Sequence, residues 1–297
     1  MTVERSPAAS APSRWVRGRT LSDGTVLHWW KQVVAVLLVY GLYELVRNAT
    51  ISGPEVAFQN ALRIIDWQRA LGMNHELIIQ QWSLDWMPLI VFSNYFYGSV
   101  YAVATFGIIV WLYRRRSDAY PLWRNTLAVM TSMGLIGFAA FPLMPPRLLD
   151  VLGDGRPFGF VDTLVEFPTF WSFDAEAVRT ISNPFAAMPS LHCAWALWGA
   201  FALYPRVRSS WARTLAVVYP IVTVYVVIAT GNHFFLDVAG AVVIFVAGYG
   251  LARLATRAGR GRPISERDDG DAPRVHLTDA RQEAATFAHV YRSIAAR

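Results

Sequence analysis

The chain has 297 residues, of which 54% are hydrophobic and only 16% are charged, and its mean hydropathy is +0.31. A soluble domain carries about 25% charged residues, so this composition excludes an ordinary soluble protein and predicts an integral membrane protein whose partner is the lipid bilayer. The net charge of +6 does not indicate a nucleic-acid partner, because in a membrane protein the placement of the basic residues carries the information.

Six apolar runs dominate the chain. Residues 1–27 lack an apolar core, which predicts a disordered cytoplasmic tail rather than a cleaved signal peptide. Runs of about 20 apolar residues predict membrane-spanning helices, and they lie at 28–47, 87–113, 122–144, 188–205, 211–231 and 233–255. The expected fold is therefore an all-α, polytopic membrane protein: a bundle of six transmembrane helices forming one domain over 28–257. Residues 258–297 predict a polar, largely disordered cytoplasmic tail, with a short amphipathic helix at 278–296.

Residues 54–85 differ from the apolar runs. Ala57, Ala61, Ile64 and Leu71 recur at helical spacing with charged residues between them. This pattern predicts an amphipathic helix in the membrane interface. Its role is either a connector that covers the other helices or a lid over a substrate site, and the pattern favours the connector.

The basic residues predict the orientation in the membrane. Most of the 27 lysines and arginines lie in the N-terminal tail, in the links at 114–124 and 206–213, and in the stretch after Arg253. Since cytoplasmic segments are enriched in Lys and Arg, these segments and both termini are expected to be cytoplasmic. The 145–187 loop carries more acidic than basic residues, so it is expected to lie outside. The predicted localisation is the cell membrane.

Two stretches on the expected outer side carry ionisable residues, which are the default functional candidates at the ends of spans. The stretch TGNHFFLD joins the last two apolar runs, and MPSLH opens the fourth. His233 and Asp237 are four residues apart, so on a helix the carboxylate lies beside the imidazole and orients it as a nucleophile. His192 is then the candidate general acid for the leaving group.

Other residues nearby suit a phosphate. The start of the fourth run offers free backbone N–H groups, Ser190 adds a hydroxyl donor, and Pro189 suits a first helical turn. Arg147 has a planar donor fork that matches phosphate, and Asn232 offers a neutral donor. These groups are able to meet the charge of a phosphate, so we expect neither a metal nor another cofactor.

Each of these residues alone also has an ordinary structural interpretation. His192 fits a core histidine bonded to a backbone carbonyl, Asp237 fits a helix cap, and Arg147 fits an interfacial anchor. Cys193 is expected to be a small buried apolar residue. The convergence of several candidates on one face of the membrane favours the functional interpretation.

The motifs FAAMPSLHCAW and ATGNHFFLDVAGA resemble the second and third signature motifs of the type-2 phosphatidic acid phosphatase superfamily. This superfamily contains lipid phosphatases, lipid phosphotransferases and vanadium haloperoxidases. MPSLH with GNHxxLD, preceded by PPRL, is most similar to its inositolphosphotransferase branch, which includes inositol phosphorylceramide synthases. The resemblance covers about residues 54–255 and implies that His233 forms a phosphohistidine, that Asp237 orients it, that His192 protonates the leaving oxygen, and that Ser190 binds the phosphate.

The chain lacks two basic residues that the wider superfamily has in its first and third motifs. In the first motif, KxxxxxxRP, Arg147 matches the Arg loosely and Ala140 replaces the Lys. Val226 and Val227 occupy the positions of the Ser-Arg pair in the third motif, which the inositolphosphotransferase branch also lacks. Arg179 is the candidate for a substitute cation.

These observations predict an enzyme that moves a phosphoryl or phospho-headgroup unit of a membrane lipid phosphate at the extracytoplasmic face. Hydrolysis and transfer to a polyol or another alcohol both remain open. A non-catalytic lipid-binding or transport protein is the alternative, but it would need none of the three candidate catalytic residues. A haem or metal protein would leave the Ser, Arg and Asp without a role.

Overall fold

The computed structural model of the chain describes residues 18–21, 26–49, 53–167, 169 and 184–260. The chain forms two compact units, Met1–Ala258 and Gly259–Arg297, and the fold described below is that of the first. Most of the predicted C-terminal tail, including the expected helix at 278–296, lies outside the described residues, as do residues 1–17.

The regular elements among the described residues are helices, apart from one short antiparallel pair, β1 (Arg19–Thr20) and β2 (Val26–Leu27). This pair belongs to the predicted N-terminal tail, but Leu21 and Leu27 are buried in the core, so part of that tail packs on the helices. The helices in chain order are α1 (Trp29–Ala49), α2 (Pro54–Ala70), α3 (Glu76–Leu84), α4 (Met87–Tyr95), the π-helix η1 (Phe96–Val100), α5 (Tyr101–Arg115), α6 (Tyr120–Ala140), the 3-10 helix η2 (Pro146–Leu148), α7 (Leu149–Leu152), α8 (Thr163–Glu166), α10 (Leu191–Leu203), α11 (Ser210–Ala229) and α12 (Phe235–Arg260).

Each of the six predicted apolar runs contains a helix in the structure, but the predicted count of six spans is not supported. Among the described residues, three helices are long and apolar enough to cross a membrane: Met87–Arg115, Ser210–Ala229 and Phe235–Arg257. Helix α10 has only 13 residues, because both ends of the predicted 188–205 run are non-helical. A straight helix of that length is shorter than the hydrocarbon core of a bilayer.

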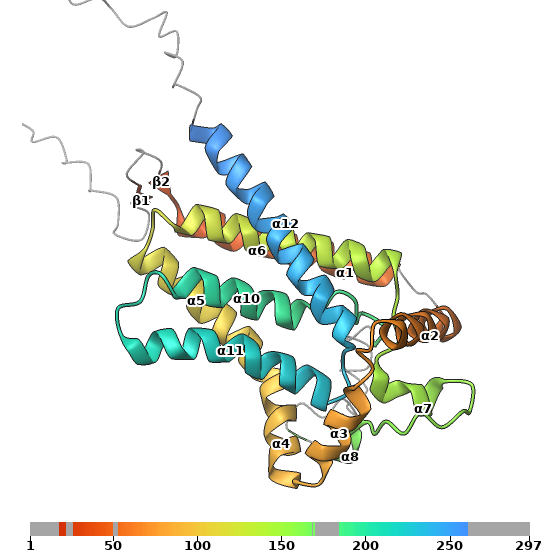
Figure 1. Cartoon of the computed structure of the whole chain (residues 1–297). Coiled ribbons are helices and arrows are strands. Elements are labelled where there is room, and N and C mark those ends of the chain that lie inside the picture. The colour runs from red at the N-terminus through yellow and green to blue at the C-terminus, as the bar shows by residue number, and fades with distance from the viewer. Residues whose placement is uncertain (1–17, 22–25, 50–52, 168, 170–183, 261–297) are drawn as a thin grey trace, which may run out of the picture. The chain divides into compact units, whose positions relative to one another are not determined.

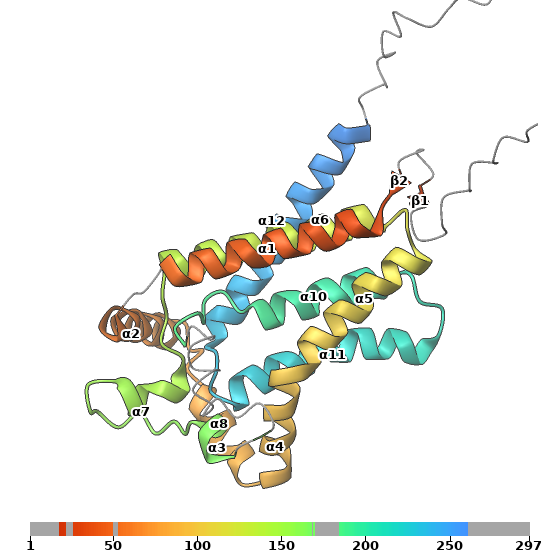
Figure 2. The ribbon, with the colours of Figure 1, turned by 180° about the vertical axis from the view of Figure 1, so that it is seen from behind.

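Helix α10 lies at the centre of the helical packing, in contact with α5, α6 and α11. Helix α1 runs along α6, and α12 crosses the other long helices (Figures 1 and 2). The indole N–H of Trp198 in α10 donates to the carbonyl of Trp123 in α6 at 2.8 Å, and Trp198 is fully buried. This buried contact fixes the middle of α10 against α6.

The predicted amphipathic helix over 54–85 is two helices, α2 and α3. The N–H of Met73 bonds to the carbonyl of Gln68 at 2.8 Å, and the N–H of Gly72 bonds to that of Arg69 at 3.1 Å. These are the two bonds of a Schellman cap, in which Gly72 takes the left-handed conformation with φ of +68°. The cap ends α2, so Leu71 is exposed rather than part of the buried face.

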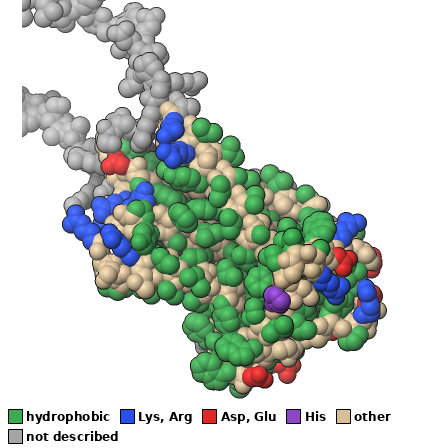
Figure 3. All heavy atoms as spheres, viewed as in Figure 1, with side chains coloured by type: hydrophobic (Ala, Val, Ile, Leu, Met, Phe, Trp, Pro, Cys, Tyr) green, Lys and Arg blue, Asp and Glu red, His purple; other side chains and the backbone are tan. Residues whose placement is uncertain are grey.

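The surface combines large apolar areas with charged ends. Figure 3 shows hydrophobic side chains over the middle of one face, with charged side chains gathered toward its two ends. Val103 and Phe106 on α5 and Val243 on α12 are each more than half exposed. Such exposure suits contact with lipid tails, and the apolar helices fit a membrane protein.

Candidate active site

The two stretches with the predicted catalytic residues meet in space. His192 lies in the first turn of α10, and His233 lies in the link between α11 and α12. The centroids of their imidazole rings are 6.0 Å apart, and the ring planes make an angle of 60°. His233 is 3% exposed, whereas His192 is only partly buried. The arrangement allows both rings to act on one group bound beside them.

The link that carries His233 begins with a second Schellman cap. The N–H of Gly231 bonds to the carbonyl of Ile228 at 2.9 Å. The N–H of Asn232 bonds to the carbonyl of Val227 at 3.0 Å. Gly231 has a φ of +66°, in the left-handed region that glycine adopts most readily. The motif TGNH therefore ends α11 sharply and places His233 directly after the turn.

His233 and Asp237 form a buried pair. The Nδ1 atom of His233 lies 3.2 Å from Oδ2 of Asp237, and the same oxygen accepts a hydrogen bond from the N–H of Phe234 at 2.8 Å. A carboxylate in this position favours the tautomer with its proton on Nδ1, which leaves the lone pair on Nε2. His233 precedes α12 and lies outside the candidate spans, and burial lowers its pKa to about 4. Its imidazole is therefore neutral at neutral pH.

Two buried side chains from α2 and α3 cap the start of α12. Oε1 of Glu76 accepts from the N–H of Phe235 at 2.9 Å, and Oε1 of Gln68 accepts from the N–H of Leu236 at 2.9 Å. Gln68 also donates to Glu76 at 2.7 Å. Because protein groups occupy these N–H donors, the start of α12 is held in place and is not free to bind an anion.

Ser190 is the N-cap residue of α10. Its Oγ accepts from the N–H of Cys193 at 3.4 Å, and its own N–H donates to the carbonyl of Asp237 at 3.0 Å. The helix begins at Leu191, so Pro189 precedes the cap and does not occupy the first helical turn, because Ser is favoured at the N-cap. Ser190 is fully buried, and its contact with a phosphate stays a prediction.

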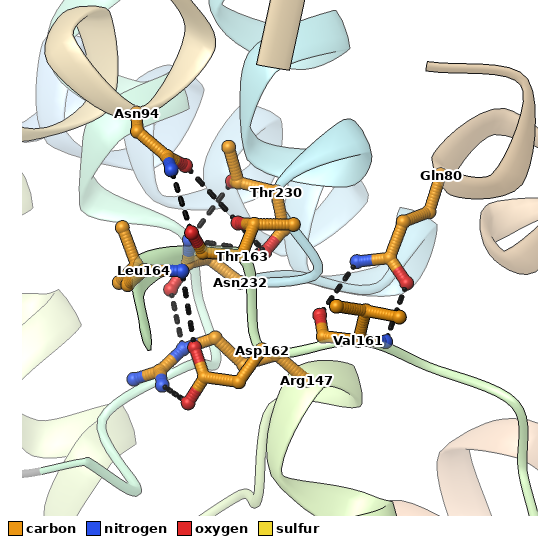
Figure 4. A network of polar contacts seen from close by, with 9 residues as sticks. All are labelled: Gln80, Asn94, Arg147, Val161, Asp162, Thr163, Leu164, Thr230 and Asn232. Atoms are coloured by element: carbon orange, nitrogen blue, oxygen red, sulfur yellow. Dashed lines mark hydrogen bonds and ion pairs between the residues drawn. The ribbon is translucent and has the colours of Figure 1, made fainter. Parts of the chain in front are cut away.

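Arg147 lies beside the link but is already paired (Figure 4). Its Nε donates to Oδ1 of Asn232 at 2.9 Å, and its Nη1 donates to Oδ2 of Asp162 at 2.6 Å. The Arg147 and Asp162 side chains are 15% and 11% exposed. The structure thus brings Arg147 and Asn232 together next to His233, with a carboxylate that the sequence analysis had not assigned to the site.

A polar network extends from Asn232 toward α4 and α8 (Figure 4). Asn232 donates to the hydroxyl of Thr230 at 2.8 Å. The hydroxyl of Thr163 lies 3.2 Å from the carbonyl of Thr230, and Asn94 donates to the carbonyl of Thr163 at 2.7 Å. Thr163 and Thr230 are fully buried, and Asn94 is 1% exposed. These contacts fix Asn232 against elements from three parts of the chain.

Arg179, the predicted substitute cation, lies in the 170–183 stretch outside the described residues. Across the described part of the chain, no three or more His, Cys, Asp or Glu side chains are grouped as metal ligands.

Aromatic rings enclose His192. The Tyr97 ring stacks on it with centroids 4.4 Å apart and planes at 24°. The Tyr101 ring meets it edge to face at the same centroid distance, with planes at 66°. Tyr97 belongs to η1, and Tyr101 begins α5.

The residues around the site that the sequence analysis missed have partners on other elements. Gln68 and Glu76 bind backbone groups 168 and 159 positions away, and Tyr97 reaches His192 from another helix. No periodic pattern indicates such contacts. The sequence contains only a weak indication of the Asp162 contact, because Asp162 is an acidic residue in the same loop as Arg147, 15 positions away.

A comparison with protein-family models matches residues 62–251 to the PAP2 superfamily. The match covers more than half of the chain and includes both candidate histidines and Asp237. No curated protein and no solved structure shows a significant match. Members of this superfamily are generally phosphatases or phosphotransferases, in keeping with a site built on two histidines. The chain belongs to the PAP2 superfamily.

Proposed function

We propose that the protein is a membrane-embedded enzyme that transfers the phosphoryl group or phospho-headgroup of a membrane lipid phosphate through a phosphohistidine at His233. The observation that carries this proposal is the approach of His192 to within 6.0 Å of the buried His233–Asp237 pair. Membership of a superfamily of phosphatases and phosphotransferases supports it.

In the first step, the lone pair on Nε2 of His233 attacks phosphorus. The N–P bond forms as the P–O bond to the leaving group breaks, and the protonated imidazole of His192 gives its proton to the leaving oxygen. Asp237 accepts the hydrogen bond from Nδ1–H and stabilises the positive charge that develops on the ring.

In the second step, water or an alcohol attacks the phosphohistidine. Its O–H proton goes to the now neutral His192, the new P–O bond forms, and the N–P bond breaks to restore His233. Water gives hydrolysis, and a polyol or another alcohol gives transfer, which is the reaction of the inositolphosphotransferase branch. The resemblance of MPSLH and GNHxxLD to that branch favours an alcohol acceptor.

The phosphate is proposed to bind at the start of α10. The backbone N–H groups of Leu191 and His192 lie in the first turn of α10, where an α-helix offers them no carbonyl partner. Free N–H groups at a helix start bind anions. Arg147, with Asn232 beside it and Ser190 at the cap, lines the same region, and Arg179 is proposed as a further cation from the adjoining loop.

We further propose that all six apolar helical segments cross the membrane, as one catalytic domain over 28–257. The helices α1, α5, α6, α10, α11 and α12 run in alternating directions (Figure 1), as successive spans do. The short α10 is surrounded by other helices, so it need not match the bilayer by itself. The site then faces the extracytoplasmic side, and both termini are cytoplasmic.

The test uses purified protein in detergent with phosphatidic acid, a polyprenyl phosphate and an inositol phospholipid, each with and without added inositol. Mass analysis of the products identifies phosphate release or headgroup transfer. We expect His233→Ala to abolish both activities and to lose a covalent phosphate label that is stable in alkali and labile in acid.

The matched control is His75→Ala. His75 is exposed and its side chain does not cap α3, so this variant should retain full activity. Unchanged turnover in His233→Ala would exclude the mechanism.

A further inference from the structure

The surroundings of His192 include a break in the regular helix that faces it. Residues Met87–Arg115 form one continuous helical run, and η1 (Phe96–Val100) interrupts it as a π-helix. A π turn adds one residue to the helix and is found frequently at functional sites. The extra residue turns the following side chains by about 100° relative to a regular helix. Tyr97 lies inside this turn and Tyr101 directly follows it.

Both tyrosine rings contact His192, and they do so from different directions. One ring face of the imidazole is covered by Tyr97, which stacks at 24°, while Tyr101 meets it at 66°. These two ring contacts restrict rotation of the imidazole about its side-chain bonds.

Tyr101 is itself held by a further contact. Its ring lies 5.6 Å from that of Trp195 in α10. The indole N–H of Trp195 donates to the hydroxyl of Thr131 in α6 at 3.0 Å. Contacts among the three helices α5, α10 and α6 therefore fix the Tyr101 ring beside His192.

We propose that Tyr97 and Tyr101, presented by the π turn, are positioning residues that hold the imidazole of His192 in the orientation needed to protonate the leaving group. This inference rests on the proposed function, because it assigns the two rings to the general acid of that reaction. A general acid is effective only when its N–H points at the leaving oxygen. The ring of the neighbouring residue Phe96 packs on Tyr219 instead, so Phe96 is not assigned to the positioning of His192.

The test compares two kinds of substrate that differ in their need for an acid. An alkyl lipid phosphate has a poor leaving group and requires protonation, whereas 4-nitrophenyl phosphate has a good leaving group and does not. We expect Tyr97→Ala to lower kcat on the alkyl phosphate by on the order of 10- to 100-fold, part of the contribution of a general acid, and to change kcat on the aryl phosphate less than about 3-fold. Tyr97→Phe keeps the stacked ring and should retain most of the activity on both.

A double-variant comparison separates positioning from a general loss of structure. If Tyr97 acts through His192, then Tyr97→Ala adds little to the loss already caused by His192→Ala. Phe96→Ala, on the same π turn, is the matched control and should keep the wild-type ratio of the two activities. Melting temperatures of all variants identify any that fail to fold.

The outcomes separate this inference from the proposed function. Equal losses on the two substrates in Tyr97→Ala, or additive losses in the double variant, would overturn the positioning role. Full activity on the alkyl phosphate in His192→Ala would instead overturn the proposed mechanism, and the positioning role with it.

Discussion

Asp237 determines which nitrogen of His233 carries a proton. Its Oδ2 atom faces Nδ1 of His233 and also binds the N–H of Phe234, so the carboxylate is fixed relative to the turn. A carboxylate accepts hydrogen bonds but cannot donate one when ionised. An ionised Asp237 therefore favours the proton on Nδ1, which leaves on Nε2 the lone pair that the proposed reaction uses.

Asp237→Asn removes the carboxylate charge with almost no change in size. Because one oxygen of Asp237 faces both Nδ1 of His233 and the N–H of Phe234, Asn is expected to place its carbonyl oxygen there, so the variant loses the negative charge that stabilises the developing imidazolium. We expect kcat for the lipid phosphate to fall on the order of 10²- to 10³-fold, as when one group that stabilises transition-state charge is lost. Single-turnover measurements detect the loss in the first step, and a melting curve shows whether the fold is kept. A loss smaller than 10-fold would contradict the role given to Asp237.

The site residues that could be predicted from the sequence are those whose partners lie a few positions away along the chain. The four-residue spacing of His233 and Asp237 predicted their contact, although α12 begins at Phe235 and His233 lies in the turn before it. Ser190 was predicted beside a helix start, but its burial as the N-cap depends on where that start falls. The roles of Glu76 and Tyr97 depend on which helices pack together, and a single sequence does not contain that information.

At the scale of the elements, the two Schellman caps have the same backbone conformation but different surroundings. Gly72 and Gly231 have φ of +68° and +66°. A Cβ added at Gly72 would meet nothing within 4 Å, whereas one at Gly231 would lie 2.7 Å from Nε2 of Gln80 and 3.1 Å from Cβ of Arg147. The second cap is therefore the one whose glycine is needed for close packing at the site.

Gly231→Ala and Gly72→Ala form a matched pair. Both force an alanine into the left-handed region, which costs about 1 to 2 kcal/mol, so both should lower the melting temperature. Only Gly231→Ala should also displace Arg147 and the turn before His233, and we expect it to lose on the order of 10-fold or more in kcat, since small displacements of a reacting group are costly. Loss of activity of the same size in Gly72→Ala would show that the effect is general destabilisation.

The sequence predicted the existence of the long elements better than their interruptions. Apolar composition located all six helices, because burial in lipid or in the core requires it over the whole length. The break between α2 and α3 depends on one glycine at a helix end. The π turn η1 contains Gly98 and Ser99, but a glycine inside an apolar helical run does not specify a π turn. The break between α2 and α3 and the π turn place Glu76 and Tyr97 at the site, where Glu76 caps α12 and Tyr97 stacks on His192. The features that are hardest to predict from the sequence therefore provide contacts that support the site.

At the scale of the whole molecule, the candidate site and the basic links occupy opposite ends of the helical core. The start of α10, the α11–α12 link and η2 lie at one end, and the α5–α6 and α10–α11 links lie at the other (Figures 1 and 2). Arg114 and Arg115 in the last turn of α5 and Arg116 directly after it are exposed. Because basic segments are retained on the cytoplasmic side, this separation favours an extracytoplasmic site.

The single native cysteine makes the orientation directly measurable. Cys193 is 1% exposed, so the wild-type chain should not react with a membrane-impermeant maleimide. Arg156→Cys places a thiol in the 145–187 loop, where the Arg156 side chain is 61% exposed, and Ser209→Cys places one in the exposed α10–α11 link. We expect Arg156→Cys to be labelled on intact cells and Ser209→Cys only after permeabilisation. The reverse pattern would place the site on the cytoplasmic side, and its substrate would then have to come from the inner leaflet.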